Sequence, residues 1–152
     1  MDPRPSVTVA AVIERGGKFL LVEEEDDGRM LFNQPAGHLE LNESLVEACA
    51  REVLEESAWH FRPRELIGIY RWSKPATPSN AGVTYLRFAF CGELGEHEAG
   101  RELDAGIARA VWLDAAEIRA LRERHRSPLV LRCVEDYLAG RRYPFDALIE
   151  HA

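Results

Sequence analysis

Two short apolar runs separated by a pair of glycines constrain the fold most strongly. Residues 6–13 (SVTVAAVI) are rich in β-branched side chains, residues 18–23 (KFLLVE) are mostly apolar, and Gly16 and Gly17 lie between them. Runs of this kind predict β-strands, and a Gly-Gly pair predicts a tight turn. We therefore expect a β-hairpin near the start of the chain.

Strand-like and helix-like segments are interleaved along the rest of the sequence. A short extended piece is expected over residues 30–35, with strands over 66–72, 83–94 and 107–113, and helices over 42–57, 114–121 and 127–139. Asn42 would cap the first helix and Gly140 would end the last. A hairpin and a strand meander interleaved with helices predict an α/β (α+β) fold, with helices on both faces of a mixed β-sheet.

Length and composition limit the classes of protein to which the chain can belong. A chain of 152 residues, 46% hydrophobic, is long enough to bury a core as a single domain, with a short C-terminal tail from about residue 141. Its net charge of −7 disfavours binding to a nucleic-acid polymer. Its apolar runs are too short to span a membrane, and residues 1–5 do not resemble a secretory leader.

Three cysteines, Cys49, Cys91 and Cys133, are spread widely over the sequence. Their odd number and wide spacing fit neither a disulfide framework nor a CxxC zinc site. We therefore expect a reduced, cytoplasmic protein.

Three glutamates share one face of the helix expected over residues 42–57. Glu55 and Glu56 follow Glu52 at positions i+3 and i+4, where like charges cost a few tenths of a kcal/mol per pair. One interpretation is a solvated acidic face. The other is a site for Mg²⁺ or Mn²⁺, which prefer hard oxygen ligands. The preceding loop, residues 34–40 (QPAGHLE), favours the second because it brings a glycine and free backbone groups to the same helix.

The spacing around these glutamates resembles a known signature. Gly37, five residues, Glu43, seven residues and then residues 51–59 (REVLEESAW) are similar to the signature of the Nudix hydrolases. Ala58 stands where that signature has glycine, directly after the helix, and a left-handed alanine there should cost about 1 kcal/mol. Residues 31–40 and 126–144 are similar to the phosphatase NudJ subgroup of this family.

The resemblance implies a Nudix α/β/α sandwich with a mixed sheet and an enzyme that requires Mg²⁺, with Mn²⁺ as a substitute. It implies that water attacks phosphorus in a phosphoanhydride of a small diphosphate or triphosphate, such as thiamine-pathway pyrophosphates and nucleoside di- and triphosphates. The implied catalytic and metal-binding residues are Glu52, Glu55 and Glu56, joined by the backbone carbonyl of Gly37. One of the glutamates, with Glu52 as the leading candidate, would accept the proton of the attacking water. Glu43 and Arg51 would form a structural ion pair.

Residues that contact the substrate are harder to predict. Phe32 and Trp72 would stack on an aromatic ring of the substrate, with core packing as the alternative for each. Gln34 would donate hydrogen bonds to a ring or a phosphate. Arg87 interrupts an apolar strand, and is expected either to contact phosphate or to be a solvated charge on the outer face. Asp104 would bind a metal or position water, as other Nudix proteins place an extra acid in this loop.

Several alternatives stay open at this point. Glu102 competes with Asp104 for the role of the extra acid. The substrate could instead be ADP-ribose or a dinucleoside polyphosphate. A non-catalytic module that senses a nucleotide is disfavoured, because such modules typically lose a signature glutamate. In each case the expected partner is a small phosphate compound, with the protein a monomer or a homodimer.

Overall fold

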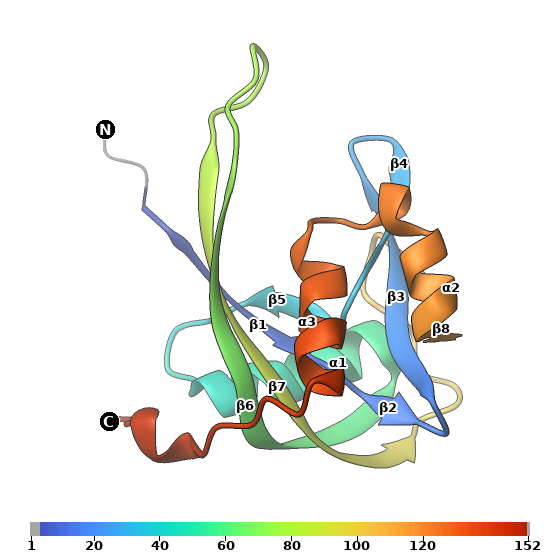
Figure 1. Ribbon diagram of the computed structural model, residues 1–152, viewed down its shortest axis with the longest axis vertical. Coiled ribbons are helices and arrows are strands. Elements are labelled where there is room, and N and C mark those ends of the chain that lie inside the picture. The colour runs from blue at the N-terminus through green and yellow to red at the C-terminus, as the bar shows by residue number, and fades with distance from the viewer. Residues whose placement is uncertain (1–3, 152) are drawn as a thin grey trace.

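Figure 1 shows the computed structural model of the protein, which describes residues 4–151. The expectations about Met1, Asp2, Pro3 and Ala152 lie outside the described residues. The strands are β1 (Ser6–Ala11), β2 (Glu14–Arg15), β3 (Lys18–Asp26), β4 (Arg29–Asn33), β5 (Ala36–His38), β6 (Trp59–Lys74), β7 (Val83–His97) and β8 (Ile107–Asp114). The helices are α1 (Leu45–Ser57), α2 (Ala115–Ala120), α3 (Leu129–Leu138) and two short 3-10 turns, Arg122–Arg124 and Phe145–Ala147.

The first sheet is mixed and has the order β5-β1-β7-β6. Strands β1 and β7 run parallel, with Val9 opposite Phe88, whereas β1–β5 and β6–β7 are antiparallel. Strands β6 and β7 continue beyond the rest of the sheet as a long two-stranded arm, which rises above the body of the protein in Figure 1. The base of this arm forms one wall of the cavity described below.

The second sheet is antiparallel, with the order β2-β3-β4 and with β8 paired to the other edge of β3. The predicted hairpin is present at Gly16 and Gly17, which have φ of 60° and 81°, but its first strand was wrongly assigned. The turn joins β3 to the two-residue β2 and not to β1. Strand β1 already pairs with β5 on one edge and with β7 on the other, so it has no free edge for β3.

Helices cover both sides of the sheets, as predicted. Ala48 and Val53 of α1 pack in one core cluster with Phe90 of the first sheet. Cys133 of α3 packs in a second cluster with Phe19 of the second sheet. None of the helices within residues 4–151 is long and apolar enough to cross a membrane.

Helix α1 begins three residues later than predicted, and Asn42 is not its N-cap. Ser44 is the cap: its Oγ accepts a hydrogen bond from the N–H of Glu47 at 3.0 Å, and the Glu47 carboxylate accepts one from the N–H of Ser44 at 2.9 Å. This reciprocal pair is a capping box. Asn42 instead has a φ of 65° in the preceding turn, a conformation that asparagine tolerates.

Strand β6 is more than twice as long as predicted, and it begins directly after α1. Its pairing with β7 shifts register near Trp59, Pro63 and Leu66. Such shifts bend a strand and break the apolar alternation by which strands are found in a sequence. The prediction over 66–72 therefore captured only its middle.

Candidate active site

Strand β5 and helix α1 bring the glycine and the glutamates of the sequence signature together. A side chain at Gly37 would place its Cβ less than 3.0 Å from the Glu52 carboxylate, which is closer than non-bonded atoms approach. The φ of Gly37 is not positive, so its backbone does not itself demand glycine. A side chain at Gly37 would instead displace the Glu52 carboxylate, which occupies that place.

A cluster of three carboxylates lies at the end of α1. Glu52, Glu55 and Asp104 each offer an oxygen, and these oxygens lie within 4.8 Å of one another. The N–H of Asp104 donates to the backbone carbonyl of Glu55 at 3.0 Å, which fixes this loop against the helix. Carboxylate oxygens are the ligands that Mg²⁺ prefers, so the chemistry and the closeness of these three side chains suit such an ion.

Electrostatics also favour a cation at this position. Burial raises the pKa of Glu52 and of Glu55, and nearby Asp104 raises both further, whereas Arg51 offsets only part of this rise. Burial raises the pKa of Glu56 to about 9, with contributions from Glu24 and Glu52. The Glu56 carboxylate also accepts a hydrogen bond from the N–H of Ala36 at 2.9 Å. Crowded, partly desolvated carboxylates of this kind take up either protons or a metal ion.

Arg51 connects the loop before α1 to the glutamates on it. Its guanidinium contacts Glu43 at 2.7 Å and Glu52 at 2.7 Å, and it donates to the carbonyl of His38 at 3.0 Å. The hydrogen bond from Arg51 lowers the pKa of Glu43. The structure thus places Glu43 and Arg51 as an ion pair, which is the arrangement that the resemblance implies.

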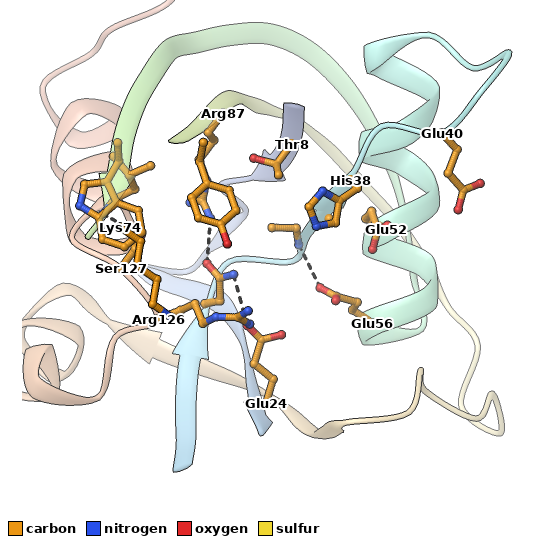
Figure 2. A pocket seen from close by; sticks show the side chains of 16 residues that line it. Thr8, Glu24, His38, Glu40, Glu52, Glu56, Lys74, Arg87, Arg126 and Ser127 are labelled. Carbon is orange, nitrogen blue, oxygen red and sulfur yellow. Dashed lines mark hydrogen bonds and ion pairs between the residues drawn. The ribbon is translucent and has the colours of Figure 1, made fainter. Parts of the chain in front are cut away.

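A cavity of about 400 Å³ opens beside these residues. In Figure 2, Glu52 and Glu56 lie on one side of it, whereas Lys74, Arg87 and Arg126 lie on the other. The cavity is therefore polarised, with acidic side chains toward α1 and basic side chains toward the arm and α3.

Of the predicted substrate contacts, the structure brings two to this cavity. Trp72 lines it and stacks with Tyr85 of the neighbouring strand, with ring centroids 5.9 Å apart at 15°. Arg87 also lines it and is only 6% exposed. The alternative of a solvated outer-face charge is therefore wrong for Arg87, because its face of the sheet is covered.

Phe32 and Gln34 do not line the cavity. Phe32 is 3% exposed and belongs to the core, with the guanidinium of Arg124 4.7 Å from its ring centre. Core packing, the alternative interpretation of Phe32, is what the structure shows. Gln34 is 1% exposed; it donates to the carbonyl of Val130 at 2.7 Å and accepts from Arg87 at 2.8 Å. Its amide is buried and bonded within the protein, so it does not contact a substrate in the cavity.

Other residues of the cavity were missed from the sequence. Tyr85, Lys74 and Glu24 line it without any motif to mark them, because the fold alone brings their strands together. Arg126 pairs with Glu24 at 2.6 Å. The segment around Arg126 was noted for its resemblance to the NudJ subgroup, and that resemblance was the one signal available.

Ala58 adopts the conformation expected for the missing glycine of the signature. Its φ is 63°, and its N–H donates to the carbonyl of Leu54 as the C-cap of α1. Alanine therefore ends the helix in the left-handed conformation that glycine favours, at a cost in backbone strain.

Comparisons with known proteins identify the family of this chain. The family model described as the NUDIX domain matches residues 2–132. The chain is 42% identical over 146 residues to Phosphatase NudJ of Escherichia coli K12, which covers 95% of this chain and 91% of that protein, and equally to Phosphatase NudJ of Shigella flexneri. A solved structure of a NUDIX hydrolase from Nitrosomonas europaea is 53% identical, covers 97% of this chain and 98% of its own, and has a TM-score of 0.90.

These matches cover nearly the whole chain, and the family model spans the segment that carries the signature. The identities are high enough to show more than a shared fold. The chain belongs to the Nudix family, as a hydrolase that acts on phosphorus-containing acid anhydrides and is similar to Phosphatase NudJ.

Proposed function

We propose that the protein is a Mg²⁺-dependent pyrophosphatase that hydrolyses a phosphoanhydride of a small diphosphate or triphosphate, with Mn²⁺ as a substitute. The observation that carries the proposal is the cluster of Glu52, Glu55 and Asp104, whose oxygens lie within 4.8 Å of one another. Glu52 of this cluster lines a polarised cavity, with basic side chains on the far side. Nudix hydrolases generally use divalent metals, and this cluster supplies the oxygen ligands that such metals prefer.

The residues of the site have separate roles in this proposal. Glu52, Glu55 and Asp104 would hold the metal, with Glu56 and the carbonyl of Gly37 as further oxygen ligands. A divalent ion held there would neutralise phosphate oxygens and make the attacking water more acidic.

Glu52 accepts the proton of the attacking water. At the same time the water oxygen bonds to phosphorus and the bridging P–O bond breaks. Arg51 keeps Glu52 in position through their 2.7 Å contact. The leaving phosphate departs toward the basic side of the cavity.

The proposed substrates are thiamine-pathway pyrophosphates and nucleoside di- and triphosphates. The similarity to Phosphatase NudJ supports this class. A cavity of about 400 Å³ suits a small molecule, and the stacked rings of Trp72 and Tyr85 offer a flat surface to an aromatic group. We further propose that the chain acts as a single domain in the cytoplasm, as a monomer or homodimer, without a nucleic-acid or membrane partner.

The test is release of phosphate or pyrophosphate from thiamine diphosphate, CTP, ADP-ribose and a diadenosine polyphosphate. Each compound is assayed with Mg²⁺ and with EDTA. We expect release from thiamine diphosphate or CTP with Mg²⁺, and loss of that release with EDTA or in Glu52→Gln. Release that persists in EDTA would contradict the metal-dependent proposal. Binding of these compounds without release from any of them would favour a nucleotide-sensing module.

A further inference from the structure

Arg87 is the single buried lysine or arginine among residues 4–151. It lies on β7, with Thr8 of β1 and Tyr70 of β6 as its partners in the two neighbouring strands. Burial of a cation is costly unless an anion compensates for it. The groups around Arg87 therefore show whether the protein itself supplies this anion.

The protein does not supply that anion. Arg87 donates to Oε1 of Gln34 at 2.8 Å, to Oδ1 of Asn33 at 3.0 Å and weakly to Sγ of Cys133 at 3.9 Å. All three partners are neutral, and no carboxylate in the described part of the chain lies within 4.0 Å of its guanidinium. Other arginines near the site differ from it, because each pairs with a glutamate: Arg51 with Glu43, Arg124 with Glu23, and Arg126 with Glu24.

The two amides that contact Arg87 are held in one orientation. The NH₂ group of Gln34 donates to the backbone carbonyl of Val130 at 2.7 Å, and that of Asn33 donates to the Glu24 carboxylate at 3.4 Å. With both donors engaged, both carbonyl oxygens face the guanidinium. Asn33 and Gln34 therefore fix the direction of Arg87 without cancelling its charge.

Part of the guanidinium is open to the cavity. Arginine has five N–H donors, and the hydrogen bonds to Gln34, Asn33 and Cys133 use three of them. Nε has no hydrogen-bond partner within residues 4–151. In this part of the chain, every fully buried side-chain nitrogen or oxygen has a hydrogen-bond partner. Nε of Arg87 is therefore not fully buried, and Arg87 lines the cavity on the side opposite Glu52.

We propose that Arg87 binds phosphate oxygens of the substrate on the side of the cavity remote from the carboxylate cluster, and that Asn33 and Gln34 are its positioning residues. The proposal rests on the proposed function, since it assigns the anion to the phosphate substrate. Arg87 is then the residue that contacts the substrate. Gln34 does not make the direct contact with the substrate that the sequence predicted, but acts by holding Arg87.

The first test compares Arg87→Met and Arg87→Lys with Arg71→Met, a control at an exposed arginine of β6 outside this cavity. The KM is measured for thiamine diphosphate and CTP, and methylenediphosphonate binding is measured by calorimetry with Mg²⁺. Charge-assisted hydrogen bonds predict that Arg87→Met raises the KM and the Kd about 10- to 100-fold while kcat changes far less, with a smaller rise for Arg87→Lys. The control should leave both constants unchanged. Folded Arg87→Met protein with unchanged KM and Kd would overturn the proposal.

The second test addresses the positioning residues through Gln34→Glu, which places a carboxylate against the guanidinium. This ion pair should consume the charge of Arg87 and raise the Kd for methylenediphosphonate about 10-fold. In the Arg87→Met background, Gln34→Glu should have almost no further effect on the Kd. If Gln34 only stabilised the fold, the substitution would raise the Kd equally in both backgrounds. Equal effects in both backgrounds would refute the positioning role. If wild-type protein hydrolyses none of the substrates, the proposed function fails, while the methylenediphosphonate measurement still decides on Arg87.

Discussion

Substitution of Gly37 by alanine should move the Glu52 carboxylate while leaving the stability of the fold almost unchanged. The added Cβ would lie less than 3.0 Å from the Glu52 carboxylate, which must move by about 1 Å to restore an ordinary contact of roughly 3.5 Å. A misplacement of about 1 Å can cost roughly 100-fold in rate. We therefore expect Gly37→Ala to lower kcat about 100-fold with Mg²⁺.

The free energy of unfolding should change much less. Moving one side chain off its preferred rotamer costs about 0.5–1.5 kcal/mol. Replacing glycine at a position without positive φ returns about 0.4–1 kcal/mol through the unfolded chain. The two effects nearly cancel, so the Tm of Gly37→Ala should stay within about 3 °C of wild type.

The assay is Mg²⁺-dependent phosphate release together with thermal unfolding. Gly100→Ala is the matched control, because a Cβ at Gly100 meets nothing within 4 Å, and it should keep wild-type turnover. A Gly37→Ala protein with turnover within about threefold of wild type would refute the reasoning. A large fall in Tm would show instead that Gly37 supports the fold.

Three further predictions follow from the same contacts. Glu52→Gln and Glu56→Gln should each give a folded protein whose kcat falls at least ~100-fold in the phosphate-release assay; turnover near wild type in either would contradict its assigned role. Ala58→Gly should stabilise the protein by about 0.5–1 kcal/mol, because relief of a left-handed alanine outweighs the added chain entropy; thermal unfolding checks this, and an unchanged or lower Tm would argue against strain at φ 63°. The folded protein retains a proton on Glu56 up to about pH 9, whereas the unfolded carboxyl loses it near 4.5, so metal-free protein should lose stability as pH rises between these values. Mg²⁺ should restore the Tm most at the alkaline end, and a metal-free Tm that rises across this range would exclude the assigned pKa.

The sequence predicted the acidic side of the site well, because its residues are close along the chain. Glu52, Glu55 and Glu56 occupy one helix, and the spacing to Gly37 follows the family signature. Asp104 was also proposed, and the structure brings it to Glu52 and Glu55. Helical periodicity and a motif of fixed spacing are sufficient to predict that such residues lie together.

The basic side of the cavity is formed by segments that are far apart in the sequence. Its residues could therefore not be predicted from local spacing. The sequence left Arg87 as either a phosphate contact or a solvated charge, and only the packing of α3 and the second sheet shows that its face is buried. Gln34 was assigned to the substrate because the sequence does not show that Val130 and Arg87 engage its amide. The first strand of the hairpin was misassigned for a similar reason, since β1 takes its partners from distant segments.

The position of a bound metal tests the central claim most directly. Crystals grown with Mn²⁺ and methylenediphosphonate would locate the ion by anomalous diffraction. We predict a peak within about 2.5 Å of an oxygen of Glu52 and of at least one further carboxylate among Glu55, Glu56 and Asp104, with the diphosphonate between this ion and Arg87. An ion bound away from Glu52, or a diphosphonate bound without any ion at the cluster, would contradict the account.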